Sequence, residues 1–149
     1  MGDRGVGARV TLVVHAPTSA TAAAEFPSDE SLDARGRAWA EGGRGSLRGD
    51  RVVCAPEPAC QQTCVLLGLR PEVDDGLRGW DLGSWAGRTL DEVAAEQPDE
   101  VGSWLTDPSA APHGGEPITA LVARTRRWLE RAQPGHTLAV CGPAVVRAA

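Results

Sequence analysis

The chain has 149 residues, of which 42% are hydrophobic, so it is long enough for one domain with a buried core and too short for two. Its net charge of -5 is spread along the sequence, and neither a basic surface for nucleic acid nor a polybasic membrane anchor is expected. All fifteen basic residues are arginine and tyrosine is absent, which excludes a Schiff-base lysine, a phosphate-loop lysine and a tyrosine base.

The first eight residues are polar and rich in glycine, and we expect a flexible tail over 1–8 before a single domain over 9–149. No segment has the apolar core of a signal peptide or the length of a membrane span, so a cytoplasmic protein is expected. The four cysteines contain no Cys-x-x-Cys pair, which favours buried free thiols over disulfides or a zinc site. No metal and no other cofactor is therefore expected.

The first half of the domain alternates predicted strands and helices. Apolar and β-branched residues predict a buried strand over 9–14, which ends at His15 and a proline turn. Because ligands of open α/β sheets bind at the carboxyl ends of the strands, His15 is expected at the floor of a pocket. The later segments are a short helix or turn over 18–24, a helix over 34–41 with Ala38 and Trp39 available to the core, a strand over 51–55, a helix over 58–68 and a short strand near 72–73.

The second half begins with a loop over 79–87 whose tryptophans are expected to pack in the interior. A helix over 89–96 starts at a threonine with a glutamate three residues later, which is the pattern of a capping box. A helical turn over 101–105, an exposed loop over 107–115, a helix over 118–132, a strand over 137–141 and a helix from Pro143 follow. The helix over 118–132 is amphipathic, with Leu121, Val122, Thr125, Trp128 and Leu129 inward and Arg124, Arg126, Arg127 and Arg131 outward. Strands that alternate with helices imply a mostly parallel sheet with right-handed crossovers.

Six segments occur in an order that a known family shares. They are the strand ending at His15, residues 26–36, Gln62-Thr63, residues 81–87, Gly114-Gly115-Glu116 and residues 138–149. Together they resemble the histidine phosphatase superfamily, the phosphoglycerate mutase-like proteins. The resemblance covers nearly the whole chain and implies a three-layer α/β fold, with a mostly parallel sheet flanked by helices and a shortened C-terminal part.

In that family a histidine attacks phosphorus, two arginines and a second histidine hold the phosphoryl oxygens, and an acidic residue protonates the leaving oxygen. By this resemblance, His15 falls on the nucleophile and Glu116 on the proton donor. The rest of the phosphate cradle is replaced. Val14 and Ala59 stand where the family has arginines, Ala16 stands where it has glycine, and Cys141-Gly142 stands where it has Thr-His.

The loss of three phosphate-holding groups is expected to abolish phosphatase activity, because each such group contributes about 3 kcal/mol to transition-state stabilisation. Only Arg35, Arg88 and Arg147 are candidates for compensation. The first hypothesis is a repurposed acid/base enzyme that acts on a non-phosphorylated small molecule by cyclisation, elimination, isomerisation or hydrolysis. The alternatives are an inactive pseudophosphatase that serves as a binding module, and a weak phosphomonoesterase with His15 as nucleophile.

Two further expectations concern the thiol at position 141 and the end of the chain. A Cys141 thiolate beside His15 offers a rival nucleophile, although strand alternation points Cys141 away from the face of position 142. The chain ends within the helix that follows its last strand, whereas members of the family continue. We expect either a homodimer through this shortened C-terminal edge or a fragment of a longer chain.

Overall fold

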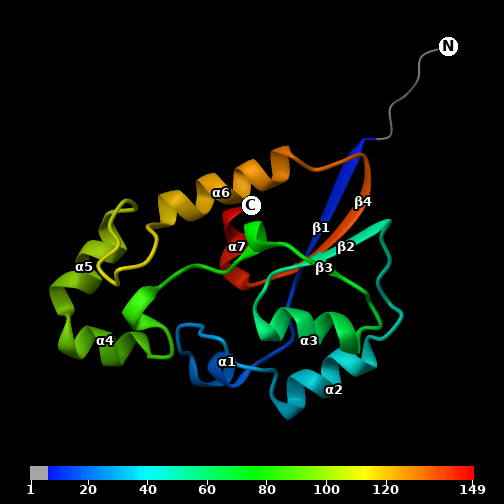
Figure 1. The fold of residues 1–149 in the computed structure, drawn as a ribbon. Helices are drawn as coiled ribbons and strands as arrows, with labels where there is room; N and C mark the ends of the chain where they lie inside the picture. Colours follow the sequence, from blue (N-terminus) through cyan, green and yellow to red (C-terminus); the bar gives the residue numbers. More distant parts are fainter. Residues whose placement is uncertain (1–6) are drawn as a thin grey trace.

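The computed structural model describes residues 7–149 and has a four-stranded parallel sheet at its centre (Figure 1). The strands are β1 (Ala8–Val14), β2 (Arg51–Cys54), β3 (Glu72–Val73) and β4 (Gly135–Cys141), in the spatial order β1-β4-β2-β3. Strand β4 pairs with β1 on one side and β2 on the other, and its last five residues are buried. The predicted mostly parallel α/β sheet is thus confirmed. Residues 1–6, the greater part of the expected tail, lie outside the described residues.

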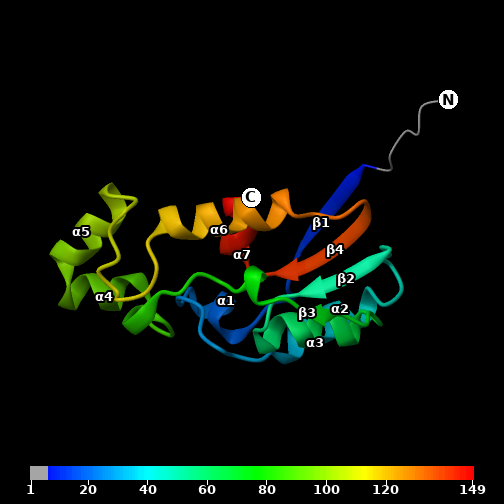
Figure 2. The ribbon, with the colours of Figure 1, turned by 45° about the horizontal axis from the view of Figure 1, so that its top comes forward.

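Helices cover both faces of this sheet and complete three layers. Figure 2 shows α2 and α3 on one face and α6 and α7 on the other, while α4 and α5 extend beyond the sheet. The helices are α1 (Ser19–Ala23), α2 (Ala34–Gly42), α3 (Pro58–Leu66), α4 (Leu90–Glu96), α5 (Pro98–Thr106), α6 (Ile118–Glu130) and α7 (Pro143–Ala148), with short 3₁₀ turns η1 (Asp75–Leu77) and η2 (Gly83–Trp85). The three-layer α/β architecture is the one that the resemblance implied.

Local sequence signals explain where several helices begin. Thr89 and Glu92 form the predicted capping box at the start of α4. Helices α3 and α7 both begin at a proline, which suits the first turn because its missing N–H is not needed there. Helix α5 is longer than the predicted turn over 101–105, because Pro98 and the two acidic residues after it favour an earlier start.

The interior of the described residues is divided into a main core around the sheet, a small cluster that includes Ala16, Ala40 and Ala59, and a separate aromatic core beneath α4 and α5. All four cysteines are free, buried members of the main core, as predicted. Trp85 is fully buried in the aromatic core, which confirms a packing role. The expectation for Ala38 and Trp39 was wrong, because α2 turns Gly36 and Ala40 inward and leaves Trp39 63% exposed.

Two kinds of feature are not found within residues 7–149. None of the helices there combines the length and the apolar character that crossing a bilayer requires. In the same residues, no three or more histidine, cysteine, aspartate or glutamate side chains are grouped so that they could hold a metal ion.

Candidate functional site

His15 lies directly after β1, at the carboxyl end of the parallel sheet. Its backbone N–H donates to the carbonyl of Cys141 at 3.1 Å, which ties the end of β1 to the end of β4. Its half-buried ring places Nδ1 2.7 Å from the carbonyl oxygen of Ala16. A carbonyl oxygen can only accept, so Nδ1 carries the proton and Nε2 of the neutral ring carries a lone pair. The ring is thus oriented with Nε2 as its base or nucleophile.

The backbone that orients this ring is held by the Gln-Thr motif of α3. The N–H of Ala16 donates to Thr63 Oγ1 at 3.0 Å, and that hydroxyl donates to the carbonyl of Ala59 at 2.7 Å, all within the buried interior. Gln62 Oε1 accepts the N–H of Leu32 at 2.9 Å. Thr63 therefore holds the loop that follows His15, and Gln62 holds the segment just before α2.

The residues expected to line the site are brought together only in part. Ala16 and Ala59 share one small buried cluster, whereas Cys141 belongs to the main core. Val14 is 39% exposed at the end of β1. A Cβ built on Gly142 would meet no heavy atom within 4 Å, so open space lies beside the end of β4. The small residues at positions 16 and 59 thus fill the interior, and the free space lies at position 142.

The thiol of Cys141 does not suit the role of nucleophile. Its side chain is fully buried, and this burial, together with the nearby charge of Glu57, raises the pKa of Cys141 to about 11. Burial likewise raises the pKa of Cys64 to about 12 and the pKa of Cys60 further still. The thiols are therefore protonated near neutral pH and behave as small apolar groups.

Within residues 7–149, no arginine forms a hydrogen bond or an ion pair with the ring of His15. Arg88 pairs with Glu96 at 2.8 Å. Arg35 and Arg147 are exposed on α2 and α7. None of the three arginines that were candidates to replace the missing phosphate-holding groups therefore bonds to His15.

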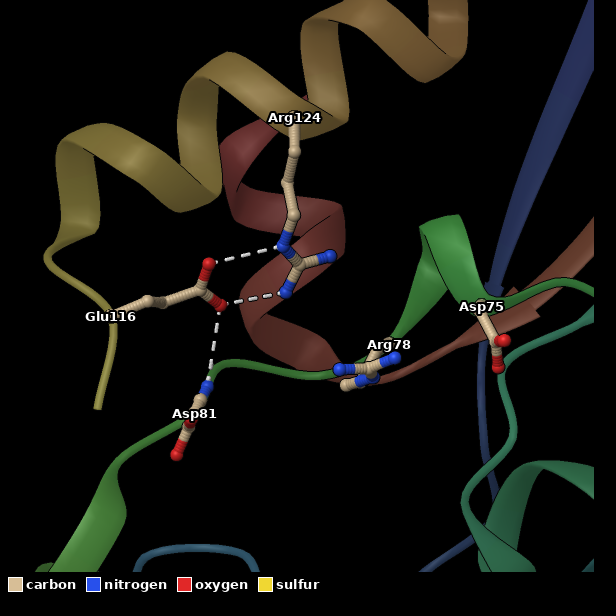
Figure 3. Close-up of a pocket in the computed structure, with 5 residues that line it drawn as sticks. All are labelled: Asp75, Arg78, Asp81, Glu116 and Arg124. Atoms are coloured by element: carbon tan, nitrogen blue, oxygen red, sulfur yellow. Dashed lines mark hydrogen bonds and ion pairs between the residues drawn. The ribbon is translucent and has the colours of Figure 1, made fainter.

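Glu116 lies in the loop before α6, and its carboxylate is gripped by Arg124 (Figure 3). Nε of Arg124 donates to Oε2 at 3.1 Å, Nη2 donates to Oε1 at 2.7 Å, and the N–H of Asp81 also donates to Oε1 at 3.3 Å. Arg124 was expected to face solvent, and that expectation was wrong. Both oxygens of the Glu116 carboxylate therefore accept hydrogen bonds, as expected of an anion that stabilises the fold or faces a ligand.

An open pocket of about 260 Å³ lies beside this ion pair. It is lined by Asp75, Arg78, Asp81, Glu116 and Arg124, which Figure 3 shows around the loop between η1 and η2. His15 is not among its lining residues. The role of Glu116 as the proton donor to a His15 reaction stays a prediction, because no contact places the two side chains together.

His113 is buried next to this loop and was not singled out in the sequence. Its Nδ1 accepts the N–H of Gly115 at 2.9 Å, so Nε2 carries the proton and has no hydrogen-bond partner among the described residues. The rings of Trp80 and Trp85 stand edge-on to it, at centroid distances of 6.2 and 5.4 Å. Burial lowers the pKa of His113, and the charges of Asp81 and Glu116 oppose this effect only in part.

This burial predicts that acid destabilises the fold. The unfolded chain binds a proton near the ordinary His113 pKa of 6.5, whereas the folded chain, whose pKa is lower, does not. The stability contributed by neutral His113 is complete above pH 6.5 and is lost as the pH falls below that value. Urea unfolding at pH 7.5 and pH 5 measures the loss. A His113→Gln variant, whose side-chain oxygen can still accept the Gly115 N–H, is expected to show a smaller decrease, and an unchanged decrease would contradict the prediction.

The fold and the position of His15 define a three-layer α/β domain with a histidine at the end of its first strand. A model of the histidine phosphatase superfamily (branch 1) matches residues 10–149, and the chain belongs to this superfamily. Residues 10–149 include every strand end and loop that forms the candidate site.

Named relatives of the chain include phosphatases. It is similar to the structure of mycobacterial glucosyl-3-phosphoglycerate phosphatase Rv2419c in complex with VO3, with 25% identity and a TM-score of 0.81 over 95% of this chain and 79% of that chain. The alpha-ribazole phosphatase from Shigella flexneri shares the fold at 23% identity, with a TM-score of 0.80 over 93% of this chain and 75% of that chain. The bifunctional protein Rv2228c of Mycobacterium tuberculosis is 29% identical over 147 residues, covering 91% of this chain. The chain spans about 40% of the length of that curated relative.

Proposed function

We propose that this protein is a repurposed member of the superfamily, in which His15 performs acid/base chemistry on a non-phosphorylated small molecule. The observation that carries the proposal is the orientation of the His15 ring. Its Nδ1 donates to the carbonyl of Ala16 at 2.7 Å, and the buried Thr63 hydroxyl holds the N–H of the same residue. Nε2 is left as a lone-pair base at the carboxyl end of the sheet, where ligands of α/β proteins bind.

The surroundings of His15 argue against a phosphate monoester as substrate. A transferring phosphoryl group is stabilised chiefly by fixed cations and hydrogen-bond donors. Position 14 is a valine, position 59 is a buried alanine, and position 142 has no side chain. Each missing group of this type costs about 3 kcal/mol, or roughly a hundredfold in rate. A substrate of low charge avoids this penalty.

The chemistry that remains is the transfer of a proton. Nε2 of His15 accepts a proton from a carbon, oxygen or nitrogen atom of the substrate, and the imidazolium returns it at a later step. Cyclisation, elimination, isomerisation and hydrolysis of a small molecule all proceed by such an exchange. The Ala16 carbonyl stabilises the imidazolium, because it accepts a hydrogen bond from the opposite side of the ring.

The test compares the purified protein with a His15→Ala variant on two kinds of substrate. We expect no His15-dependent phosphate release from p-nitrophenyl phosphate, and we expect mass spectrometry to detect His15-dependent conversion of an uncharged compound in a metabolite extract. The matched control is His136→Gln, because His136 contacts Thr11 and lies near the start of β4, away from the carboxyl end of the sheet. Phosphate release that requires His15 would contradict the proposal and favour a phosphomonoesterase with His15 as nucleophile. If the metabolite extract has the same composition after treatment with the wild type and with His15→Ala, the result would favour a binding module.

A further inference from the structure

A second carboxylate, that of Glu57, lies at the same edge of the sheet as His15. Glu57 follows β2 and occupies the capping position of α3, yet its side chain makes no capping hydrogen bond. One carboxylate oxygen, Oε1, accepts the backbone N–H of Gly79 instead. The other oxygen, Oε2, is buried and has no hydrogen-bond partner among the described residues. A buried carboxylate oxygen without a donor is costly and calls for an explanation.

The loop at Gly79 is shaped to receive this side chain. A Cβ at position 79 would lie 2.9 Å from Oε1 of Glu57, so a larger residue there would push the carboxylate away. Glycine lets the carboxylate reach the backbone N–H directly. Glu57 itself precedes Pro58 and is held in an extended conformation, with φ −61° and ψ 142°. Both ends of the contact are therefore fixed by backbone features.

The strand order places Glu57 across the end of β4 from His15. Strands β1, β4 and β2 are parallel neighbours, so the residues that follow them lie at one edge of the sheet. Open space beside Gly142 lies at the end of the middle strand. His15 contacts Cys141 at the end of β4 through its backbone, and Glu57 follows the adjacent strand β2. The two residues thus lie on either side of the end of β4.

Two acceptor groups lie at this edge of the sheet. Nε2 of His15 has a lone pair, and Oε2 of Glu57 is a buried carboxylate oxygen without a donor. Arg124 donates to the carbonyl of Gly79 at 2.9 Å, but it pairs with Glu116. None of the ion pairs among residues 7–149 includes Glu57. A ligand that fits such a site supplies hydrogen-bond donors and positive charge, because a phosphate would bring further acceptors and negative charge.

We infer that Glu57 determines the specificity of the His15 site, and that the site takes a small molecule with a protonated amine or guanidinium group. This inference rests on the proposed function, because it assigns the ligand class of the same site. The carboxylate of Glu57 pairs with the cationic group and holds the rest of the molecule against Nε2 of His15. Glu57 is half-buried and the terminal torsion of glutamate is soft, so a rotation of the carboxylate that loosens the contact with Gly79 can turn the buried Oε2 toward a bound donor.

The test follows the backbone amides of His15, Gly79 and Gly142 by ¹H–¹⁵N NMR while the full chain is titrated with ethylammonium chloride, ethanol or inorganic phosphate. We expect saturable shifts with ethylammonium and none with ethanol or phosphate. In Glu57→Gln, ethylammonium binding is expected to weaken about tenfold or more, which is the typical effect of losing a charged hydrogen bond. The glutamine oxygen can still accept the Gly79 N–H, and Glu57→Asp, which keeps the charge, is expected to retain more binding than Glu57→Gln.

The control is Glu72→Gln, which removes an exposed carboxylate from the neighbouring strand β3 and is expected to bind ethylammonium as the wild type does. Equal binding by the wild type and Glu57→Gln, or no ethylammonium shift in the wild type, would overturn the assignment of Glu57 and leave the chemistry of His15 untouched. Saturable phosphate shifts at the His15 amide of the wild type would instead contradict the proposed loss of phosphate handling.

Discussion

Replacement of Gly36 by alanine is expected to destabilise the protein by about 2–3 kcal/mol, because the new methyl group has no room. Gly36 lies in the first turn of α2 and is buried against the backbone of Pro17. A Cβ at position 36 would overlap the carbonyl oxygen of Pro17 and approach its carbonyl carbon to 3.0 Å. Backbone atoms cannot rotate away as a flexible side chain does, so the segment itself has to move.

This displacement would reach the candidate site. Pro17 follows Ala16, whose N–H is bound by Thr63 and whose carbonyl orients the His15 ring. We therefore expect Gly36→Ala to change the NMR signals of the His15 ring as well as the free energy of unfolding in urea. The matched control is Gly42→Ala in the same helix, where no atom lies within 4 Å of the new Cβ. That variant is expected to gain about 0.5 kcal/mol, because alanine favours the helix over glycine. Equal stabilities of the two variants would contradict the prediction.

The sheet was largely predictable because short apolar runs leave a direct trace in the sequence. Strand β4 is such a run, ends before a glycine and is buried over its last five residues, which is typical of a parallel strand covered on both faces. The expectation that β1 is buried was wrong, because β1 lies at the edge of the sheet and its residues are half-buried or exposed. Their order in space was not visible, because β4 inserts between two strands that precede it in the chain. Because of that insertion, His15, Gly142 and Glu57, which follow β1, β4 and β2, lie at the same edge of the sheet.

The candidate site was predictable only where a motif and a strand end coincide. His15 satisfies both conditions and directly follows β1 at the carboxyl end of the sheet, and its place at the floor of a pocket stays a prediction. Arg124 was assigned to the solvent face of its helix, because helical periodicity cannot show that the preceding loop folds back to bring Glu116 beneath it. Glu57 reads in the sequence as a loop residue before a proline. Its contact with Gly79, 22 residues away, depends on how two loops meet in the folded chain.

Replacement of Trp85 by alanine is expected to lower the free energy of unfolding by about 3–5 kcal/mol, a large part of the stability of a typical domain. The indole is fully buried and lies 5.9 Å from the ring of Phe26 and 5.5 Å from that of Trp104. Its Nε1 also donates to Gln97 Oε1 at 3.2 Å, so the substitution leaves both a cavity and an unpaired acceptor.

The loss should be concentrated in the part of the molecule that lies beyond the sheet. Trp85 joins α4 and α5 to the loop that carries His113, and its ring stands 5.4 Å from the imidazole. Hydrogen exchange is therefore expected to increase first in α4 and α5 and later in β1 and β4. Trp39→Ala removes an indole that is 63% exposed and is expected to change stability by no more than about 0.5 kcal/mol. A similar loss in both tryptophan variants, or uniform hydrogen exchange in Trp85→Ala, would show that the aromatic core is not a separate unit of stability.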